Sequence, residues 1–579
     1  MNFNKGLAAV VVVVFAALCA FILVRRGSGD AGTPSSSASS SGPNAGPNGA
    51  PADPNAPGGN TLVLTFLNSV AKQSFIDQAV KDFNAQRAQV GGKAVVVKVE
   101  HGTSGDTWDS IKEGRAQPDL WSPGDESWIR QANEGWRGLH NRPLFDKTEP
   151  LANVPLCIAM WEPMARALGY PKPLGWADLA KVSSDAEGWA RYGHPEWGHF
   201  KWGHAHPDAA SGFLAVMAEV YAYSKKSKDL SVQDLKDPGL LTYMSNLEQS
   251  VAHYGLSSVW IENYMRDKGP AYLSATIQYE NGVIEGNRKT QNKPFKIVAI
   301  YPKEGSFISQ HPIGIPQADW VTSERREAAQ KFVDYLLTDE VQKQAISFGI
   351  RPLKQDPTGE PFTEEWGVRA DPPASPTFEM PSEDVLRRVK DLWLAAKKPA
   401  SVMMLLDTSG SMAGEAMDKA KEGAAGFIEK MQARDELEVR TFSDKIFQLS
   451  KAETVDKSGE AARQRVRGLF ASGGTHLYEV LKNAMLDWNE RKKKAPNRHY
   501  GIVLLTDGQD EGSPITLPDL MDVLPKGDNP ETIKIYTIAY GNKSAKSLLK
   551  EISNKSNARA YEGSTSNVGR IYQELSANF

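Results

Sequence analysis

Two apolar segments in the last third of the chain, each followed directly by an aspartate, most constrain how it can fold. Residues 400–406 and 501–506 have the nearly continuous apolar composition of strands that are buried on both faces. A helical pattern lies between them, and a third apolar segment covers residues 533–539. Because strands of this kind alternate with helices in parallel sheets, the sequence predicts a doubly wound α/β domain here.

Five oxygen-bearing side chains should meet at one edge of this sheet. Asp407, Ser409 and Ser411 alternate along one loop, Thr475 follows two glycines, and Asp507 ends the second strand. The carboxyl ends of parallel strands collect at one edge, where ligands bind. Two carboxylates and three hydroxyls are hard donors that suit a small divalent cation. An ordinary turn would explain the first motif alone, but not its combination with the two buried strands.

This combination resembles the von Willebrand factor A domain with its metal-ion-dependent adhesion site, and the resemblance extends over residues 382–579. It implies Mg²⁺ or Mn²⁺ held by Asp407, Ser409, Ser411 and Thr475, with Asp507 bound directly or through water. It also implies an unknown protein partner that supplies an acidic residue to complete the metal shell.

Residues 61–370 form a second region in which strands and helices alternate. Residues 61–66 and 94–100 are rich in β-branched and aliphatic side chains, and both are expected to be strands. Between them, apolar residues from Phe75 to Phe83 recur three and four positions apart, which predicts a helix. The alternation predicts a largely parallel sheet and again the α/β class.

Short motifs in this region occur in an order that resembles type II bacterial solute-binding proteins. They are Asn68-Ser69, residues 102–106, 111–114, 118–119 and 202–212, and Tyr279-Glu280-Asn281. The resemblance implies two lobes that close on a small solute, with an oxyanion among the candidates. The side chains expected to line that cleft are Ser69, Thr103, Ser104, Ser122, Ser211 and Tyr279. A competing interpretation is that the serines and threonines only cap helices.

The first 60 residues predict export and attachment to a membrane. Residues 7–24 are uninterrupted apolar residues, long enough for one transmembrane helix, and we interpret them as an uncleaved signal anchor. A cleaved signal peptide is the alternative. The expected order is a cytoplasmic N-terminus (1–6), the anchor (7–24), a disordered Ser/Gly/Pro/Asn/Ala linker (25–60), the solute-binding-like domain (61–370), a Pro-rich linker (371–381) and the A domain (382–579). We therefore expect a single-pass bacterial plasma-membrane protein, with its bulk in the periplasm or at the cell surface.

Charge and motif content argue against several functional classes. The net charge of −3 does not favour nucleic-acid binding, and two cysteines are too few for a disulfide framework. The chain lacks the nucleophile elbow, the phosphate-binding loop and the zinc-protease helix motif, so we expect no enzyme activity. Cys157 lies in an apolar segment that is typical of a core.

Four of the ten histidines fall within 13 residues, at His194, His199, His204 and His206. Imidazoles suit zinc, copper or nickel, so a metal site is a possible interpretation. The spacings do not match helical ligation, and the glycines, proline and tryptophans between them favour a loop with ordinary turn histidines.

The preferred interpretation is a membrane-anchored extracytoplasmic binding protein. It would capture a small solute in a two-lobed cleft and make Mg²⁺-dependent protein contacts, as in cell adhesion, through its A domain. The alternatives are a substrate-binding component associated with an ABC transporter, a structural adhesin whose first domain has no ligand, and a metalloprotein that uses the histidines.

Overall fold

The computed structural model describes residues 61–290, 295–354, 356–372, 375–526, 531–541, 545–576 and 578–579. The expected anchor and the first linker lie outside the described residues. No helix within these ranges combines the length and the apolar character that crossing a bilayer requires.

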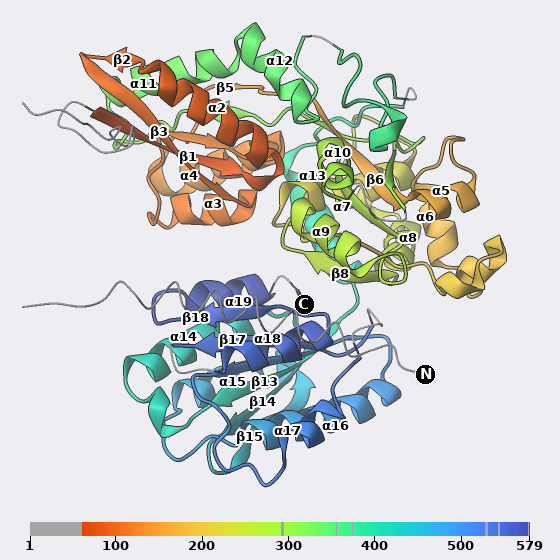
Figure 1. The fold of residues 1–579 in the computed structure, drawn as a ribbon, viewed down its shortest axis with the longest axis vertical. Coiled ribbons are helices and arrows are strands. Elements are labelled where there is room, and N and C mark those ends of the chain that lie inside the picture. Colours follow the sequence, from red (N-terminus) through yellow and green to blue (C-terminus); the bar gives the residue numbers. More distant parts are fainter. Residues whose placement is uncertain are drawn as a thin grey trace, which may run out of the picture. The chain divides into compact units, whose positions relative to one another are not determined.

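Two sheets form the core of the first region (Figure 1). The first has the order β2-β3-β1-β4-β12-β5 and the second the order β10-β6-β9-β7-β8, with β11 paired to β6. The strands of the first are β1 (Thr61–Ser69), β2 (Gln89–Val90), β3 (Lys93–Gly102), β4 (Leu120–Ser122), β5 (Thr148–Glu149) and β12 (Ile313–Gly314). Those of the second are β6 (Val154–Trp161), β7 (Trp202–Ala205), β8 (Val251–Gly255), β9 (Ala275–Tyr279), β10 (Ile297–Ile300) and β11 (Ile308–Ser309). Because the chain enters the second sheet after β5 and returns at β12, the region consists of two lobes.

Amphipathic helices cover both sheets. The first lobe carries α2 (Gln73–Gln86), α3 (Ser104–Lys112), α4 (Glu126–His140), α11 (Ser323–Leu336) and α12 (Asp339–Ser347). The second carries α5 (Glu162–Leu168), α6 (Trp176–Ser183), α7 (Ala210–Ser224), α8 (Pro238–Glu248), α9 (Ser258–Lys268) and α10 (Glu280–Lys289). The apolar periodicity of α2 is confirmed, since Phe75 and Phe83 are among its buried residues. In contrast, α7 is buried on nearly all sides because apolar residues surround it.

The helix that follows the Pro-rich linker, α13 (Glu383–Ala396), packs on α7 and α8. Its Val385, Val389 and Trp393 side chains belong to the same buried cluster as the core of the two-lobed region.

The C-terminal region contains a sheet of order β15-β14-β13-β16-β17-β18, which is the strand order of a doubly wound fold. Its strands are β13 (Ala400–Asp407), β14 (Glu436–Phe442), β15 (Ile446–Thr454), β16 (His499–Thr506), β17 (Lys534–Tyr540) and β18 (Ala560–Gly563). Only β15 runs antiparallel to its neighbour.

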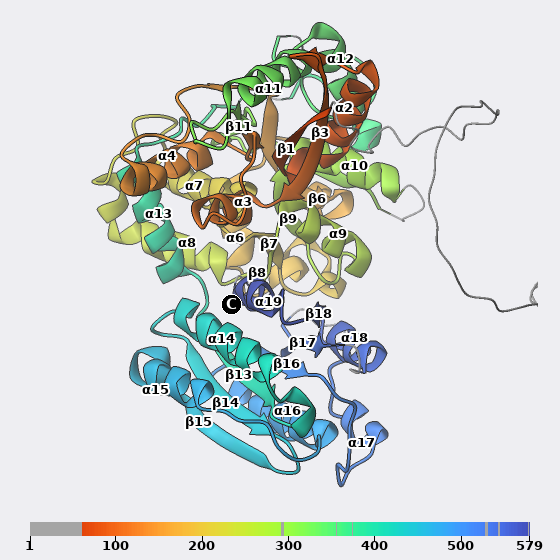
Figure 2. The ribbon, with the colours of Figure 1, turned by 90° about the vertical axis from the view of Figure 1, so that its left-hand side faces the viewer.

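Helices cover both faces of this sheet (Figure 2). One face carries α14 (Glu415–Lys430), α15 (Val455–Arg467) and α19 (Val568–Ser576), and the other carries α16 (Leu477–Lys494), α17 (Leu517–Met521) and α18 (Lys546–Lys555). Alternate residues of β13 face opposite layers, with Met404 in one core and Met403 in the other.

The α/β class expected for both regions is therefore confirmed. The prediction of a largely parallel sheet for residues 61–370 is wrong. Among the described strands there, β1 pairs in parallel with β3 and β4, and β7 with β8 and β9, whereas the other pairs are antiparallel.

A buried ion pair connects α11 to the first sheet. Asp119 is fully buried, and its carboxylate accepts two hydrogen bonds from Arg325, at 2.5 and 2.6 Å. It also accepts a hydrogen bond from the backbone N–H of Thr65 on β1, at 2.8 Å. The pair therefore fixes the start of α11 against two neighbouring strands.

We expect Asp119→Ala to lower the free energy of unfolding by about 3 kcal/mol, because it removes one partner of a buried pair and leaves a charge uncompensated. Asp319→Ala is the control, since Asp319 pairs with Arg142 while its side chain is 94% exposed. That change should cost about 0.5 kcal/mol or less. Denaturant titration of both variants measures the difference, and equal costs would contradict the role of Asp119.

Candidate functional site

The first candidate site lies at the carboxyl edge of the C-terminal sheet. Asp407 ends β13, and Asp507 directly follows β16, its parallel neighbour. The chain leaves β13 toward α14 on one face and leaves β16 toward α17 on the other. The edge between β13 and β16 is therefore the point where the strand order reverses, where open α/β sheets bind their ligands.

Hydrogen bonds join four of the five expected metal ligands into one chain. The backbone N–H of Ser409 donates to Asp407 Oδ1 at 2.8 Å, which folds the loop back on the strand. The Ser409 and Ser411 hydroxyl oxygens lie 3.1 Å apart. The Ser411 hydroxyl donates to Asp507 Oδ1 at 2.8 Å, so the two strand ends are linked through their side chains.

The fifth expected ligand reaches this edge through the loop before α16. The backbone N–H of Gly410 donates to the carbonyl of Gly473 at 2.9 Å, which brings that loop against the first motif. Thr475 Oγ1 lies only 3.2 Å from where a Cβ at Gly508 would be. Thr475 therefore lies beside Asp507, and all five side chains gather at one edge.

The spacing of these oxygens fits a small divalent cation. Bonds of about 2.1 Å in an octahedral Mg²⁺ site put neighbouring ligand atoms about 3.0 Å apart. The 3.1 and 2.8 Å separations along Ser409, Ser411 and Asp507 are close to that value. The donor set also contains only oxygens, as Mg²⁺ and Mn²⁺ prefer.

Asp407 is buried near a second carboxylate. Burial raises the pKa of Asp407, and the charge of Asp507 raises it further, although hydrogen bonds from Thr506 and Ser409 oppose both effects. A cation at this edge would offset the cost of keeping both carboxylates ionised.

Sequence reasoning missed Asp444, which lies in the turn between β14 and β15. Its carboxylate accepts a hydrogen bond from the backbone N–H of Gly474 at 2.5 Å and so holds the loop that carries Thr475. A Cβ at Gly473, whose φ is +85°, would fall 2.6 Å from this carboxylate. Asp444 could have been found from its position after a predicted strand, because β14 ends beside β13 and places Asp444 at the same edge.

The second candidate site lies where the two lobes of the first region meet. Three of the expected cleft residues converge on the loop of residues 122–124. Ser104 Oγ accepts the Gly124 N–H at 2.9 Å, and the Ser122 hydroxyl donates to the Pro312 carbonyl at 2.8 Å. The Tyr279 hydroxyl, from the second lobe, donates to the Gly124 carbonyl at 3.4 Å.

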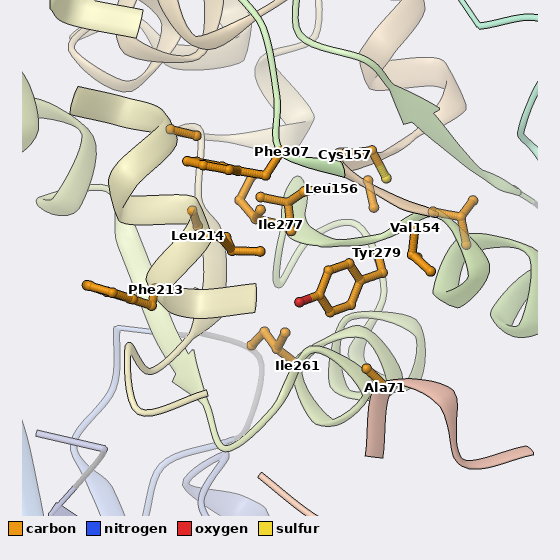
Figure 3. Packing of buried hydrophobic residues seen from close by; sticks show 14 of the residues in the cluster. Ala71, Val154, Leu156, Cys157, Phe213, Leu214, Ile261, Ile277, Tyr279 and Phe307 are labelled. Carbon is orange, nitrogen blue, oxygen red and sulfur yellow. The ribbon is translucent and has the colours of Figure 1, made fainter. Parts of the chain in front are cut away.

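The other three expected residues have more local positions. Ser69 caps the short 3₁₀ helix η1 (Val70–Lys72), and Thr103 caps α3. Ser211 is buried in the first turn of α7. Figure 3 shows Tyr279 among the buried side chains of Val154, Leu156 and Ile261.

Buried polar groups that sequence reasoning missed surround this loop. Lys72 is 2% exposed and donates to the carbonyls of Ser122 and Pro123, at 3.1 and 3.3 Å. Burial holds the pKa of its ammonium group well below the usual value. Among the described residues, no carboxylate forms an ion pair with Lys72. An isolated lysine in sequence gives no signal of such burial.

His311 and Asp125 complete this set. His311 is fully buried, and its ring lies 5.0 Å from that of Tyr279. Neither ring nitrogen forms a hydrogen bond of standard geometry. Burial and the charge of Lys72 lower the pKa of His311, which a looser hydrogen bond with the Pro123 backbone partly offsets. Asp125 caps α4 through Oδ1, while its Oδ2 is buried and unpartnered. Burial raises the pKa of Asp125 to about 7.

A cavity of about 830 Å³ opens next to this junction. Asp125 from the first lobe, Leu214 from the second, and Phe307 and Ser309 from the returning segment contribute to its lining. Arg351 lies on its wall, where two hydrogen bonds of 2.7 Å fix the guanidinium to Glu280 at the start of α10. Of the buried polar groups around the loop, Asp125 contributes to this lining, whereas Lys72, His311 and Tyr279 do not.

The four clustered histidines do not form one site. His194 stacks on Trp197 with ring centroids 3.7 Å apart, and His199 is exposed. His206 pairs with Asp208, whereas His204 points into the core of the second lobe toward Glu248. Cys157 is a buried residue of β6 (Figure 3), and burial raises the pKa of its thiol well above the usual value.

Comparison with known proteins agrees with this division of the chain. Residues 64–351 match the family model of the bacterial extracellular solute-binding protein, and residues 401–574 match that of the von Willebrand factor type A domain. The periplasmic binding protein P5PA aligns with 58% of this chain and 99% of its own, at 17% identity and a TM-score of 0.40.

Curated relatives match parts of the chain. An uncharacterized protein of Synechocystis sp. is 31% identical over 141 residues, which are 24% of this chain and 29% of the relative. Inter-alpha-trypsin inhibitor heavy chain H2 of Homo sapiens is 23% identical over 193 residues, which are 31% of this chain and 20% of the relative. The chain thus spans less than a third of the length of these two relatives. From the family matches, the chain carries a bacterial extracellular solute-binding domain followed by a von Willebrand factor type A domain.

Proposed function

We propose that this chain is an extracytoplasmic binding protein with two binding activities. The solute-binding domain captures a small solute between its lobes, and the A domain makes Mg²⁺- or Mn²⁺-dependent contacts with another protein. Residues 7–24 would attach it to the bacterial plasma membrane, with both domains in the periplasm or at the cell surface.

The observation that carries solute capture is the buried Lys72 ammonium at the lobe junction. It donates two hydrogen bonds to carbonyls, so its third hydrogen is available to a ligand. A solute with an anionic acceptor group would supply the missing negative charge. We therefore favour an anionic solute, with oxyanions as the simplest members of that class.

His311 supports the same position. Its φ of +44° lies in the left-handed region, which is uncommon for a residue with a side chain and occurs often at ligand sites. That backbone conformation accompanies a buried ring beside Tyr279 whose nitrogens form no hydrogen bond of standard geometry. We propose that His311, Tyr279 and Lys72 contact the solute together.

The ion at the proposed metal site would take its ligands from two proteins. Asp407, Ser409, Ser411, Thr475 and Asp507 would hold the ion, and Asp444 would keep the Thr475 loop in place. The bound ion would supply an electrophilic position for a carboxylate oxygen of the partner. Ser411 is exposed at this edge, so a partner can approach it.

Lys72→Met should abolish binding of an anionic solute while leaving the solute-free protein at least as stable, because the change removes a buried charge. Native mass spectrometry of the full-length protein would detect a copurified solute. Thermal unfolding with added sulfate, phosphate or molybdate would then measure binding. Lys81→Met, an exposed lysine on α2, is the matched control and should bind like the parent.

The outcomes separate solute binding from adhesion alone. One tightly bound solute that depends on Lys72 fits a substrate-binding component of a transporter as well as a receptor. A parent protein that binds none of these anions and carries no copurified mass would favour a structural adhesin. Binding that survives in Lys72→Met would contradict the proposed position of the site.

Asp407→Asn should remove the rise in Tm on adding Mg²⁺, because it takes one carboxylate from the ion. Without metal, this variant should be at least as stable as the parent, since it removes a buried negative charge that lies beside the charge of Asp507. Differential scanning calorimetry with and without Mg²⁺ measures both effects. Asp418→Asn, on the exposed side of α14, is the control that should keep the Mg²⁺ response. A full Mg²⁺ response in Asp407→Asn would exclude the site.

Asp125 should make stability depend on pH. Its pKa rises from 3.8 to about 7 on folding, so the folded state keeps a proton that the unfolded state has lost between these values. The free energy of unfolding should therefore fall as pH rises through this window and then level off. Asp125→Asn keeps the helix cap and should remove this part of the decline. Urea titrations at pH about 5 and about 8 measure the free energy of unfolding of both proteins. An equal loss of stability between the two pH values in both proteins would contradict the assignment.

A further inference from the structure

Three ionisable side chains that neither proposed site uses meet in the core of the second lobe. His204 lies on β7, Glu219 on α7 and Glu248 at the end of α8, and all three are fully buried. One ligand atom from each lies within 4.8 Å of the others.

The hydrogen bonds of His204 determine which ring nitrogen can bind a ligand. Its Nδ1 lies 2.7 Å from the Ala205 carbonyl oxygen, which can only accept, so Nδ1 carries a proton. Its Nε2 faces Glu248 Oε1 at 3.2 Å. When the ring is neutral, Nε2 and Glu248 Oε1 both present lone pairs to each other. A proton or a cation must therefore lie between them.

Two hydrogen bonds orient the side chain of Glu248. Its Oε2 accepts hydrogen bonds from the Tyr254 hydroxyl at 2.5 Å and from the Trp393 indole N–H at 3.2 Å. Two donors on one oxygen hold the carboxyl group in place and fix the direction of Oε1.

Glu219 is the feature that ordinary packing does not explain. Both of its carboxyl oxygens are buried, and neither forms a hydrogen bond of standard geometry. Burial, the charge of Glu248 and a looser side-chain hydrogen bond with Glu248 raise the pKa of Glu219 well above its usual value. A glutamate on an otherwise apolar helix, surrounded by core residues, costs stability unless a positive group compensates it.

We propose that His204 Nε2, Glu248 Oε1 and the Glu219 carboxylate bind a structural Zn²⁺ ion. Imidazole and carboxylates are established zinc ligands, and two carboxylates neutralise the ion. Tetrahedral bonds of about 2.0 Å put ligand atoms about 3.3 Å apart, close to the 3.2 Å between His204 and Glu248. Glu219 supplies the third protein ligand through one of its carboxyl oxygens.

The residues that form hydrogen bonds with the proposed ligands match this assignment. Histidines that bind metals usually donate their other N–H to a carbonyl or carboxylate, as His204 does to Ala205. Tyr254 and Trp393 orient Glu248 in the same manner. The ion would thus join β7, α7 and α8, and through Trp393 also α13.

The competing interpretation is a proton in place of the metal. An imidazolium at His204, an ionised Glu248 and a protonated Glu219 would also be neutral overall. The two interpretations differ in what Gln does at position 219, because a glutamine amide imitates a protonated carboxyl but cannot replace a zinc-binding carboxylate.

Zinc content of the full-length protein tests the proposal, measured by inductively coupled plasma mass spectrometry after dialysis against metal-free buffer. All variants carry Asp407→Asn, so that the A domain does not contribute. We expect a single zinc ion per parent chain, its loss in Glu219→Gln, and a zinc-dependent rise in Tm that disappears with it. His194→Gln, a partly exposed histidine paired with Glu196, should keep the zinc.

A parent without zinc, or a Glu219→Gln variant with unchanged zinc, would overturn the proposal. So would a Glu219→Gln variant whose Tm equals or exceeds that of the zinc-treated parent. If Glu219→Gln does not fold, Co²⁺ added to the parent decides: visible d–d absorption that zinc abolishes supports the site, and its absence overturns it.

Discussion

The free-energy cost of burying charged groups is the constraint on which the arrangement of this molecule depends. Burying an ionised side chain is costly unless a partner of opposite charge or several hydrogen bonds compensate it. Asp119 with Arg325, and Glu280 with Arg351, are compensated within the protein and fix helices against sheets. Lys72, Asp407 and Glu219 are buried without such a partner of opposite charge. The compensated pairs belong to the scaffold, and the uncompensated groups mark the places where we propose ligands.

The three proposed sites differ in how the fold produces them. At the metal edge, parallel pairing of β13 and β16 brings two strand ends together, and short loops supply the hydroxyls. At the lobe junction, contacts such as the Asn281 amide donating to the Ala71 carbonyl bring two separately built lobes together. A Cβ at Gly124 would collide with Ala210, so the glycine lets the lobes approach closely. In the second lobe, a strand and two helices bring His204, Glu219 and Glu248 together inside one core.

The sequence determined the α/β class of both regions, because continuous apolar strands and helices with three- and four-residue periodicity are local signals. It also placed Asp407 and Asp507 together, since both directly follow buried strands whose carboxyl ends must share an edge. The surrounding loop was only partly predictable. Asp444 acts through its contact with Gly474, thirty positions away in the chain, and no spacing rule connects the two.

Tertiary structure alone decided which polar residues are buried and what they face. Lys72, Asp125 and His311 come from segments far apart, and none carries a motif that distinguishes it from a surface residue. The four neighbouring histidines were the visible pattern, yet of these four only His204 turns into the core, toward two glutamates that no motif distinguishes. Periodicity reports which face of an element is apolar, whereas the environment of a single polar side chain depends on elements that pack against it from elsewhere in the chain.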